Sequence, residues 1–526
     1  MICKVFSANE WLYPDTDILT GKSYIQLDVA RQSYACAQLL IKTTDKKINV
    51  GWKSSNAEFE SPEIFKLHPI HVEFNTAERG FTMNPGTDAE CFNTRQAPFW
   101  VYDALEPIDS KCQIDCEEET LALYLRWSTA VLKAGQNTAI LQINEIDIPV
   151  TLTVYSAEIP SKETLRISNW FCLENMATYH GVEMWSEEHW QKVVEYAKLM
   201  RHARQTDFSL PPEIVDIKRN EDGVVEFDFS RAERLIKLFL SLGFRFIESL
   251  TPIHRVAWES ETFVISIFGE EKPVRSDEAM EYLKKYFSAL YDMLKRNKWL
   301  DITTQHVADE PHAGCADEYK FLSEMIRKWM PDIPIIEAVE THCLDGAVDI
   351  WVPKNNHLSN DWDIYNQKRL NGDELWFYTC CIPGGKHLNR LLDQELLRTR
   401  YLHWINYLYL LPGYLHWGFN FYHCSEDPFN KCAGKNAYSD GVGFPCGDTH
   451  IVYPGGDKPW GSVRLEMMRS GCEDYEMLKM LSSIDEEKAN SIVSRCVKSF
   501  TDYTTDVSEF EKAYKDLLLN LEKYAV

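Results

Sequence analysis

Residues 299–311 read WLDITTQHVADEP, and the stretch DEYKFLSEMIRKWMP follows at 317–331. The first stretch begins with apolar and β-branched residues, which predicts a short strand, and the second has the apolar spacing of an amphipathic helix. A strand followed by a helix is the repeating unit of parallel α/β sheets. The strand prediction also places two adjacent acids, Asp309 and Glu310, at the carboxyl end of the strand.

The same alternation of strand and helix fills residues 161–482 and gives eight units. The closed form of eight such units is a (β/α)8 TIM barrel, and an open doubly wound sheet is the alternative. No GxGxxG or GxxxxGK loop follows a predicted strand, so the sequence does not support nucleotide binding. The predicted strands are, in order, LRISNWF, ARQTDFSL, FRFIESL, WLDITTQHVADEP, IPIIEAVETH, VDIWVPKNNH, ELWFYTCCIP and YLHWGFNFYH.

Short alternating runs, among them ACAQLLIKT and IPVTLTVYS, fill residues 1–160 and predict antiparallel strands. We expect these strands to form an N-terminal β-sandwich that ends at the linker AEIPSKE. Residues 483–526 predict terminal helices packed on the barrel. The expected fold is therefore α/β, with an N-terminal β-sandwich domain, a (β/α)8 catalytic domain at 161–482 and a C-terminal helical extension.

The chain has 526 residues, a formal net charge of −25 and no basic cluster, so we expect no nucleic-acid partner. No segment has the run of about 18 apolar residues that a membrane-spanning helix needs, so we expect no membrane insertion. The start, MICKVFSANEWLYPD, lacks a signal-peptide pattern, and the 15 cysteines form no CxxC motif. These features favour a cytoplasmic protein with reduced thiols, and secretion with a removed signal is the alternative. The oligomeric state stays open.

In a barrel of this kind the active site is formed at the carboxyl ends of the strands. Asp309 and Glu310 lie at such an end, and we expect Pro311 to hold Glu310 in an extended conformation. Aromatic rings stack on sugar C–H faces while amides and imidazoles bind hydroxyl groups, so residues at the other strand ends suit a polyhydroxylated substrate. The candidate substrate-binding residues are Trp170, His254, His342, Asn356, Tyr378, Trp417 and Asn420.

Glycoside hydrolysis ordinarily uses two carboxyl groups. The seventh predicted strand ends in YTCCIP, and its one carboxylate, Glu374, lies at its start, so a nucleophile at its carboxyl end is missing. A substrate-assisted reaction needs no such nucleophile, because the 2-acetamido oxygen of the sugar attacks the anomeric carbon. One acid of an adjacent pair then orients the acetamido group, and the other protonates the leaving oxygen and later activates water.

Three other functions stay open at this point. A glycosidase acting on a different sugar would use Glu310 with Glu340, at the end of the fifth predicted strand. A noncatalytic carbohydrate-binding barrel would bind sugar without needing Glu310. A metal hydrolase would use histidine ligands, but no HxH or HExxH spacing occurs, so we expect neither a metal nor another cofactor. The histidines concerned are His254, His306, His312 and His342.

The chain resembles glycoside hydrolase family 123 and its relatives. The resemblance rests on Asp309-Glu310-Pro311, on WFYTCCIP with Tyr378, on GYLHWGFNFYH and on IVYPGGDKPWGSVRLEMMRSGCEDYEML, and it covers about residues 160–485. It implies a β-sandwich, a (β/α)8 catalytic domain and an exo-acting, retaining β-N-acetylgalactosaminidase that uses substrate assistance on oligosaccharides or glycoconjugates.

The resemblance also implies roles for single residues. Asp309 is expected to orient the acetamido group and Glu310 to be the general acid/base. Tyr378 is the candidate for a hydrogen bond to the acetamido oxygen, and Trp417 is the candidate for a wall of the sugar site. The charged residues of the last motif, which include Arg464, are expected to form a structural network under the barrel.

Overall fold

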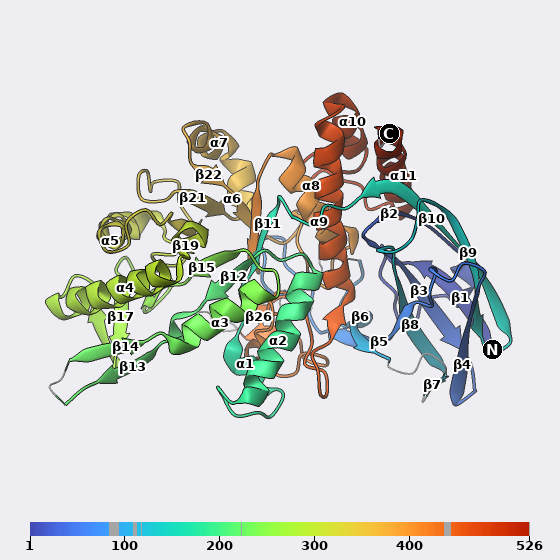
Figure 1. The fold of residues 1–526 in the computed structure, drawn as a ribbon, viewed down its shortest axis with the longest axis horizontal. Coiled ribbons are helices and arrows are strands. Elements are labelled where there is room, and N and C mark those ends of the chain that lie inside the picture. Colours follow the sequence, from blue (N-terminus) through green and yellow to red (C-terminus); the bar gives the residue numbers. More distant parts are fainter. Residues whose placement is uncertain (84–93, 109–112, 117, 222–223, 436–442, 525–526) are drawn as a thin grey trace.

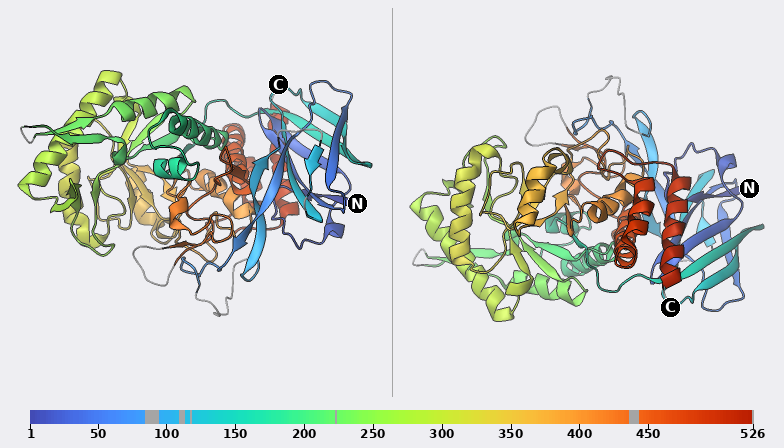
Figure 2. Two further views of the ribbon diagram at one scale, coloured as in Figure 1. Left: turned by 90° about the horizontal axis from the view of Figure 1, so that it is seen from below. Right: turned by 90° about the horizontal axis from the view of Figure 1, so that it is seen from above.

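The computed structural model describes residues 1–83, 94–108, 113–116, 118–221, 224–435 and 443–524. Two bodies of secondary structure lie side by side, and helices α9 to α11 lie between them (Figure 1). The N-terminal strands make up one body, and a parallel arrangement of strands and helices makes up the other (Figure 2). In the described part of the chain, no helix is both long and apolar enough to span a membrane.

Two sheets of mostly antiparallel strands pack around a shared core in the N-terminal body. Buried Leu39 and Leu123 of one sheet belong to the same apolar cluster as Leu141 and Val150 of the other. Buried side chains alternate with exposed ones along strand β9, as a sheet with one buried face requires. The first sheet has the order β1 (Ile2–Ser7), β3 (Tyr34–Lys42), β8 (Thr120–Ser128), β5 (Glu63–Val72), β6 (Phe99–Pro107) and β27 (Gly461–Ser462), and the second has the order β2 (Ile25–Arg31), β10 (Ile146–Glu158), β9 (Gly135–Ile143), β4 (Lys47–Ser54) and β7 (Gln113–Asp115).

The second body contains parallel strands in each of the eight predicted runs, but they form two curved sheets. Single parallel bridges, Gln305 to Ile335 and Lys354 to Tyr378, connect these sheets. A complete TIM barrel is therefore not shown. The two sheets are connected by a single bridge at each of two places, and Trp376 divides the seventh predicted strand in two. The larger sheet has the order β19 (Thr303–Gln305), β15 (Phe246–Ser249), β12 (Asp207–Leu210), β11 (Arg166–Asn169), β24 (Gly413–His416) and β23 (Phe377–Tyr378), and the smaller has the order β20 (Ile336–Val339), β21 (Ile350–Pro353) and β22 (Glu374–Leu375).

Amphipathic helices connect successive parallel strands and surround them (Figure 2). Ser186 and Ser276 cap two of these helices, as their side chains accept hydrogen bonds from the backbone N–H groups of His189 and Ala279. The hairpin β13 (Asp216–Arg219) to β14 (Val225–Asp228) follows β12, and the small sheet of β16 (Ile253–His254), β17 (Val264–Ile267) and β18 (Glu270–Pro273) follows β15. The helices are α1 (Leu173–Thr178), α2 (Glu187–His202), α3 (Ser230–Ser241), α4 (Asp277–Asn297), α5 (Ala316–Trp329), α6 (Asn355–Asn360), α7 (Trp362–Leu370), α8 (Leu397–Leu408), α9 (Val463–Ser482), α10 (Glu486–Cys496) and α11 (Val507–Tyr524).

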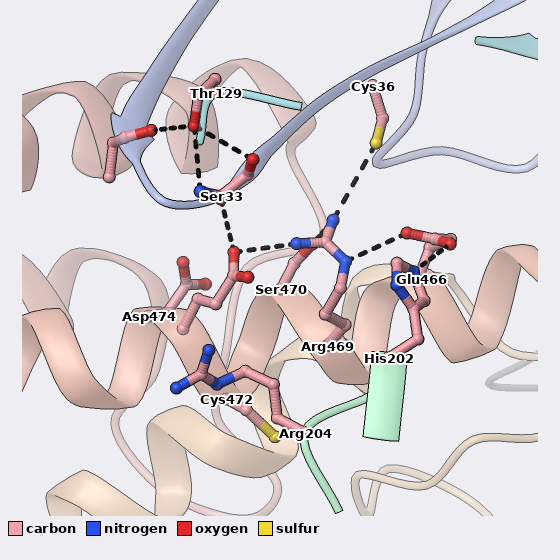
Figure 3. Close-up of polar contacts among 12 residues, drawn as sticks. Ser33, Cys36, Thr129, His202, Arg204, Glu466, Arg469, Ser470, Cys472 and Asp474 are labelled. Carbon is pink, nitrogen blue, oxygen red and sulfur yellow. Dashed lines mark hydrogen bonds and ion pairs between the residues drawn. The ribbon is translucent and has the colours of Figure 1, made fainter. Parts of the chain in front are cut away.

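Helix α9 carries the charged C-terminal motif into the space between the two bodies. Arg469 donates hydrogen bonds to Glu466 at 3.0 Å and to Glu473 at 2.9 Å, and Ser33, in the turn after β2, donates to Glu473 at 2.6 Å (Figure 3). Arg464 pairs in the same way with Asp103 of β6, at 2.9 Å. The motif forms the expected structural network, but this network joins the parallel body to the N-terminal sheets.

The C-terminal helices also contact both bodies. Helix α10 packs against α8 and α9, whereas α11 packs against α9 and against strands β2 and β10 of the N-terminal sheets. The expectation that the terminal helices pack on the barrel is therefore incomplete, since α11 also covers one of the N-terminal sheets.

Candidate active site

The acidic pair lies in the loop that follows β19, at the carboxyl end of the parallel strands. The strand ends at Gln305, before both acids. Their side chains therefore need not point to opposite faces, as neighbouring side chains in a strand do. Glu310 has a φ of +49°, which corrects the expectation that Pro311 holds it extended. A non-glycine residue in this left-handed region is strained unless its surroundings hold it, and such residues concentrate at functional sites.

Arg255 holds the backbone of the acidic pair. Its guanidinium group donates hydrogen bonds to the carbonyl oxygens of Glu310 at 3.1 Å and Asp309 at 3.3 Å. These bonds explain how the strained conformation is retained. The neighbouring His254, a predicted substrate-binding residue, is exposed and pairs with Glu271 at 3.1 Å in the small sheet after β15. The structure therefore assigns the contact with the acidic loop to Arg255, which the sequence analysis did not single out.

A buried carboxylate supports the segment between β19 and the acidic pair. Oε2 of Glu337, on β20, accepts hydrogen bonds from the backbone N–H groups of Val307 at 2.8 Å and Ala308 at 3.0 Å and from the Tyr319 hydroxyl at 3.0 Å. The other oxygen of Glu337 contacts Nδ1 of His306 at 2.7 Å. The chain immediately before the acidic pair is thus held by hydrogen bonds to a strand of the smaller sheet.

His306 lies between two buried carboxylates. Its Nε2 atom contacts Glu248, at the end of β15, at 2.6 Å, and its Nδ1 atom contacts Glu337. Burial opposes the charged ring, but attraction to Glu337 and Glu248 outweighs it and raises the pKa of His306 to about 10. The Trp170 indole N–H also donates to Glu248, at 2.9 Å. This predicted sugar-binding residue is therefore tied to the network that supports the acids.

Tyr378 connects Glu310 to a second acid. Its hydroxyl group donates to Oε1 of Glu310 and lies 3.4 Å from Oε1 of Glu340. Glu340 follows β20 and forms an ion pair with buried Lys354, which follows β21, while His357 lies 3.6 Å from its other oxygen. The ends of four neighbouring strands thus bring together three charged groups and one phenol.

Both members of the acidic pair have raised pKa values. Burial raises the pKa of Glu310, and repulsion from Glu340 adds to it while attraction to Lys354 opposes it. The surrounding protein and repulsion from Glu310 and Glu337 raise the pKa of Asp309. Asp309 is nevertheless exposed, so its carboxylate keeps contact with water and the loss of hydration is small. Repulsion from Glu310 and Glu337 is therefore the more important cause of its raised pKa. Neighbouring acids of this kind titrate as a pair, and one is protonated where the other is charged.

Aromatic side chains lie beside these polar groups. Trp170 and Trp417 pack against the apolar cluster that contains Tyr378. Trp417 also contacts Phe444, with ring centroids 5.4 Å apart, and Phe81 stacks on Phe444 at 6.4 Å. Phe81 belongs to the N-terminal body, whereas every site residue predicted from the sequence lies in the parallel body. The aromatic part of the site is therefore built by both.

A close approach of two backbones positions Phe81. Its N–H group donates to the carbonyl oxygen of Cys381, in the loop after β23, at 3.0 Å. Gly80 has a φ of +99°, and a Cβ atom at this position would lie 2.3 Å from the same carbonyl oxygen. Only glycine allows this contact. The sequence does not predict it, because the two segments are about 300 residues apart in the chain.

The other predicted residues differ in what they offer a ligand. Asn420 is buried. Its side-chain oxygen accepts a hydrogen bond from the N–H of Cys172 at 2.8 Å, and its Nδ2 atom donates to the carbonyl oxygen of Cys172 at 3.0 Å, so the amide binds the protein's own backbone. Asn356, on α6, has a buried side-chain oxygen with no hydrogen-bond partner among the described residues. His342 is half-buried just after β20. Asn356 and His342 therefore stay candidates for binding sugar hydroxyl groups, and Asn420 does not.

The histidines of the metal-hydrolase alternative do not converge. His306 is bonded to two glutamates, His254 pairs with Glu271, and Nε2 of His312 contacts the carbonyl oxygen of Ser260 at 3.2 Å. Over the described ranges, no group of three close metal-binding side chains includes a histidine. The structure therefore gives the metal-hydrolase hypothesis no support.

A buried acid and histidine lie beside Trp417 and were not predicted as site residues. His416, which ends β24, and Asp448 are fully buried, with Nε2 of His416 3.5 Å from Oδ1 of Asp448. Nδ1 of His416 accepts hydrogen bonds from the N–H groups of Gly418 at 2.9 Å and Arg390 at 2.7 Å. The neutral ring therefore carries its proton on Nε2, facing the acid. Burial raises the pKa of Asp448 to about 7.

One solved structure shares the fold of the whole chain. A family 123 glycoside hydrolase from Clostridium perfringens aligns with a TM-score of 0.68 at 14% identity, over 100% of this chain and 97% of that one. A β-galactosidase from Marinomonas ef1 aligns less well, with a TM-score of 0.38 at 10% identity, over 63% of this chain and 62% of that one. No curated protein sequence matches.

A family model matches most of the parallel body. The model of the glycoside hydrolase 123 catalytic domain matches residues 170–481. This range includes the acidic loop, the ion pair of Glu340 with Lys354 and the charged helix α9. Since the match covers more than half of the chain, the protein belongs to glycoside hydrolase family 123 and is a glycosidase.

Proposed function

We propose that this glycosidase is an exo-acting, retaining β-N-acetylgalactosaminidase-like enzyme that uses substrate assistance. The observation that carries the proposal is the adjacent pair Asp309 and Glu310 in one strained loop, with Glu310 bonded to Tyr378. The proposed catalytic domain is a (β/α)8 barrel at 161–482, between a β-sandwich at 1–160 and a helical extension at 483–526. The C. perfringens enzyme was analysed for glycolipid glycan hydrolysis, which supports an oligosaccharide or glycoconjugate as the substrate.

The two acids have different roles in this mechanism. Charged Asp309 accepts a hydrogen bond from the acetamido N–H, which directs the acetamido oxygen at the anomeric carbon and stabilises the oxazolinium ion. Glu310 gives its proton to the leaving glycosidic oxygen as that bond breaks. The Glu310 carboxylate then removes a proton from water, and water attacks the anomeric carbon and reopens the oxazolinium ring. Two displacements on opposite faces retain the configuration.

Nearby side chains have supporting roles in the proposal. Tyr378 turns from Glu310 to the acetamido oxygen when the substrate binds, which also releases the carboxyl group of Glu310 for proton transfer. Trp417, packed against Phe444, forms a wall for the sugar or its acetamido methyl group. Asn356 and His342 are the remaining candidates for hydroxyl binding. Lys354 neutralises Glu340, which would otherwise repel the acidic pair.

A second mechanism is favoured by one observation. The Tyr378 hydroxyl lies 3.4 Å from Glu340 while it bonds Glu310, so two carboxylates share one phenol. A glycosidase acting on a sugar without an acetamido group would use Glu340 as its nucleophile and Glu310 as its acid. The ion pair of Glu340 with Lys354 argues against this role, because it stabilises the carboxylate and lowers its nucleophilicity.

Para-nitrophenyl glycosides separate the two mechanisms. Wild type, Asp309→Asn, Glu310→Gln and Glu340→Gln are assayed on β-GalNAc, β-GlcNAc and β-galactoside substrates, with Glu374→Gln as a control at the other end of the seventh strand. Substrate assistance predicts activity on acetamido sugars alone and a loss of about 10²–10⁴-fold in the first two variants. Efficient cleavage of the β-galactoside, abolished by Glu340→Gln, would replace it with the second mechanism. Sugar binding without hydrolysis of any substrate would contradict both.

A further inference from the structure

Two buried cysteines and one glutamate meet where the N-terminal body contacts the loop that follows β24. The Sγ atoms of Cys432 and Cys446 and a carboxylate oxygen of Glu73 all lie within 4.8 Å of one another. In the part of the chain that the structure describes, no other group of three histidine, cysteine or acidic side chains comes so close together. We propose that these three residues bind a zinc ion that fastens the loop to the N-terminal body.

The donor atoms suit zinc in kind and in spacing. Thiolate and carboxylate groups are ligands that Zn²⁺ takes in four-coordinate sites. Zinc–ligand bonds of about 2.0–2.3 Å place neighbouring ligands of one ion roughly 3.5–4 Å apart. Cys446 Sγ lies 3.8 Å from Glu73 Oε2, so this pair already has the required spacing. The carbonyl oxygen of His71, 3.0 Å from Cys432 Sγ, is a further oxygen at the group.

Hydrogen bonds between separate segments hold the three proposed zinc ligands in place. Glu73 follows β5, and its Oε2 atom accepts a hydrogen bond from the N–H of Ala433 at 2.8 Å. The N–H of His71 donates to the carbonyl oxygen of Phe429 at 2.9 Å. The N–H of Leu392 donates to the carbonyl oxygen of Cys446 at 3.0 Å. An ion would therefore meet ligands that are already ordered, which lowers the entropic cost of binding.

The surroundings are those of a closed, structural metal site. Cys432 is 0% exposed and Cys446 is 2% exposed, whereas a catalytic zinc site keeps a position open to substrate. A cysteine binds zinc as its thiolate, so binding at this site releases protons to solvent.

The site would connect the two bodies next to the aromatic part of the active site. Phe444, which packs against Trp417, lies two residues before Cys446. The carbonyl oxygen of Gly443 accepts a hydrogen bond from the N–H of Thr82 at 2.9 Å, beside Phe81. Loss of zinc is therefore expected to loosen both aromatic rings. It should raise KM for the sugar substrate more than it lowers kcat, because the acidic loop is held by other contacts.

Metal analysis of the purified full chain tests the proposal. Inductively coupled plasma mass spectrometry is expected to find about one zinc per chain in wild type and in the control Cys472→Ser, whose buried thiol lies on α9 outside the group. Cys432→Ser and Cys446→Ser are expected to lose the metal. Wild type that neither contains zinc nor binds it when zinc chloride is added after treatment with a reductant would overturn the proposal.

Two measurements on wild type do not depend on the folding of variants. Replacement of zinc by Co²⁺ is expected to produce the sulfur-to-cobalt charge-transfer absorption of a site with thiolate ligands, and tetrahedral d–d bands. Peptide mapping under non-reducing conditions is expected to find both cysteines reduced. Absence of the charge-transfer band, or a disulfide between Cys432 and Cys446, would contradict the zinc site.

Discussion

Tyr378 donates its hydroxyl hydrogen to Glu310 and comes within 3.4 Å of Glu340. One phenol at the end of β23 therefore links the proposed general acid to a second carboxylate. That carboxylate is paired in turn with Lys354, from the end of β21. The protonation of Glu310 thus depends on groups from several strands.

The two acids are expected to respond differently to the leaving group. A good leaving group needs no proton, so Glu310→Gln should retain far more activity on a dinitrophenyl glycoside than on an alkyl glycoside. Asp309→Asn should lose a similar factor on both, because it impairs attack by the acetamido oxygen. Measurement of kcat/KM for both variants on the two substrates tests this. Equal losses in Glu310→Gln would show that Glu310 does not protonate the leaving oxygen.

The pH profile of kcat/KM is expected to shift in one direction when Lys354 is replaced and in the opposite direction when Glu340 is replaced. Attraction to Lys354 lowers the pKa of Glu310 and repulsion from Glu340 raises it. Lys354→Met should therefore shift the alkaline limb of kcat/KM to higher pH, because Glu310 keeps its proton longer. Glu340→Gln should shift the same limb to lower pH.

A matched control for this prediction is Lys368→Met. Lys368 is also a largely buried lysine of the parallel body, but it pairs with Asp345 at 2.6 Å. Its loss should leave the alkaline limb in place. A shift in the same direction for Lys354→Met and Glu340→Gln would mean that another group controls this limb.

The free energy of unfolding is expected to fall between pH 6.5 and about 10 because of His306. Its pKa is raised from 6.5 to about 10 in the folded protein. The stabilisation is therefore complete below pH 6.5 and is lost as the pH rises through 10. His306→Asn should cost about 3–5 kcal/mol at neutral pH, because it leaves Glu248 and Glu337 without a cation. Denaturant unfolding at several pH values measures both effects.

His403→Asn is the control for the His306 prediction. His403 is also buried, but burial lowers its pKa to about 4, so it is neutral in folded and unfolded chains above pH 6.5. Its loss should leave the slope of stability against pH unchanged in this range. A His306→Asn variant with the wild-type slope would show that His306 is not the titrating group.

Substitution of Gly80 is expected to impair both stability and sugar binding. Gly80→Ala would place Cβ 2.3 Å from the carbonyl oxygen of Cys381, whereas Gly346→Ala, at a φ of +76°, would meet nothing within 4 Å. Both changes carry the cost of a left-handed alanine, about 1 kcal/mol. Gly80→Ala should cost about 1–3 kcal/mol more and should raise KM by moving Phe81. Equal stability and equal KM in the two variants would show that Gly80 does not position Phe81.

Local patterns in the sequence predicted the parts of the fold that depend on neighbouring residues. Runs such as FRFIESL and IPIIEAVETH became the strands β15 and β20, because their apolar and β-branched residues favour a buried strand whatever packs on it. The same patterns placed Asp309 and Glu310 beyond the end of β19. They could not predict the conformation of Glu310, because Arg255 holds it from an insertion about 55 residues earlier in the chain.

The sequence by itself determined that eight strand and helix runs follow an all-strand segment, and that two adjacent acids lie at a strand end. Periodicity and spacing are local properties, so they are visible in the sequence without knowledge of the tertiary contacts. Only the tertiary structure decided which groups meet: Glu340 with Lys354 and Tyr378, His306 with its two glutamates, Phe81 with Phe444, and Glu73 with two cysteines. These contacts join segments far apart in the chain, and packing and burial alone bring them together and set their charge states.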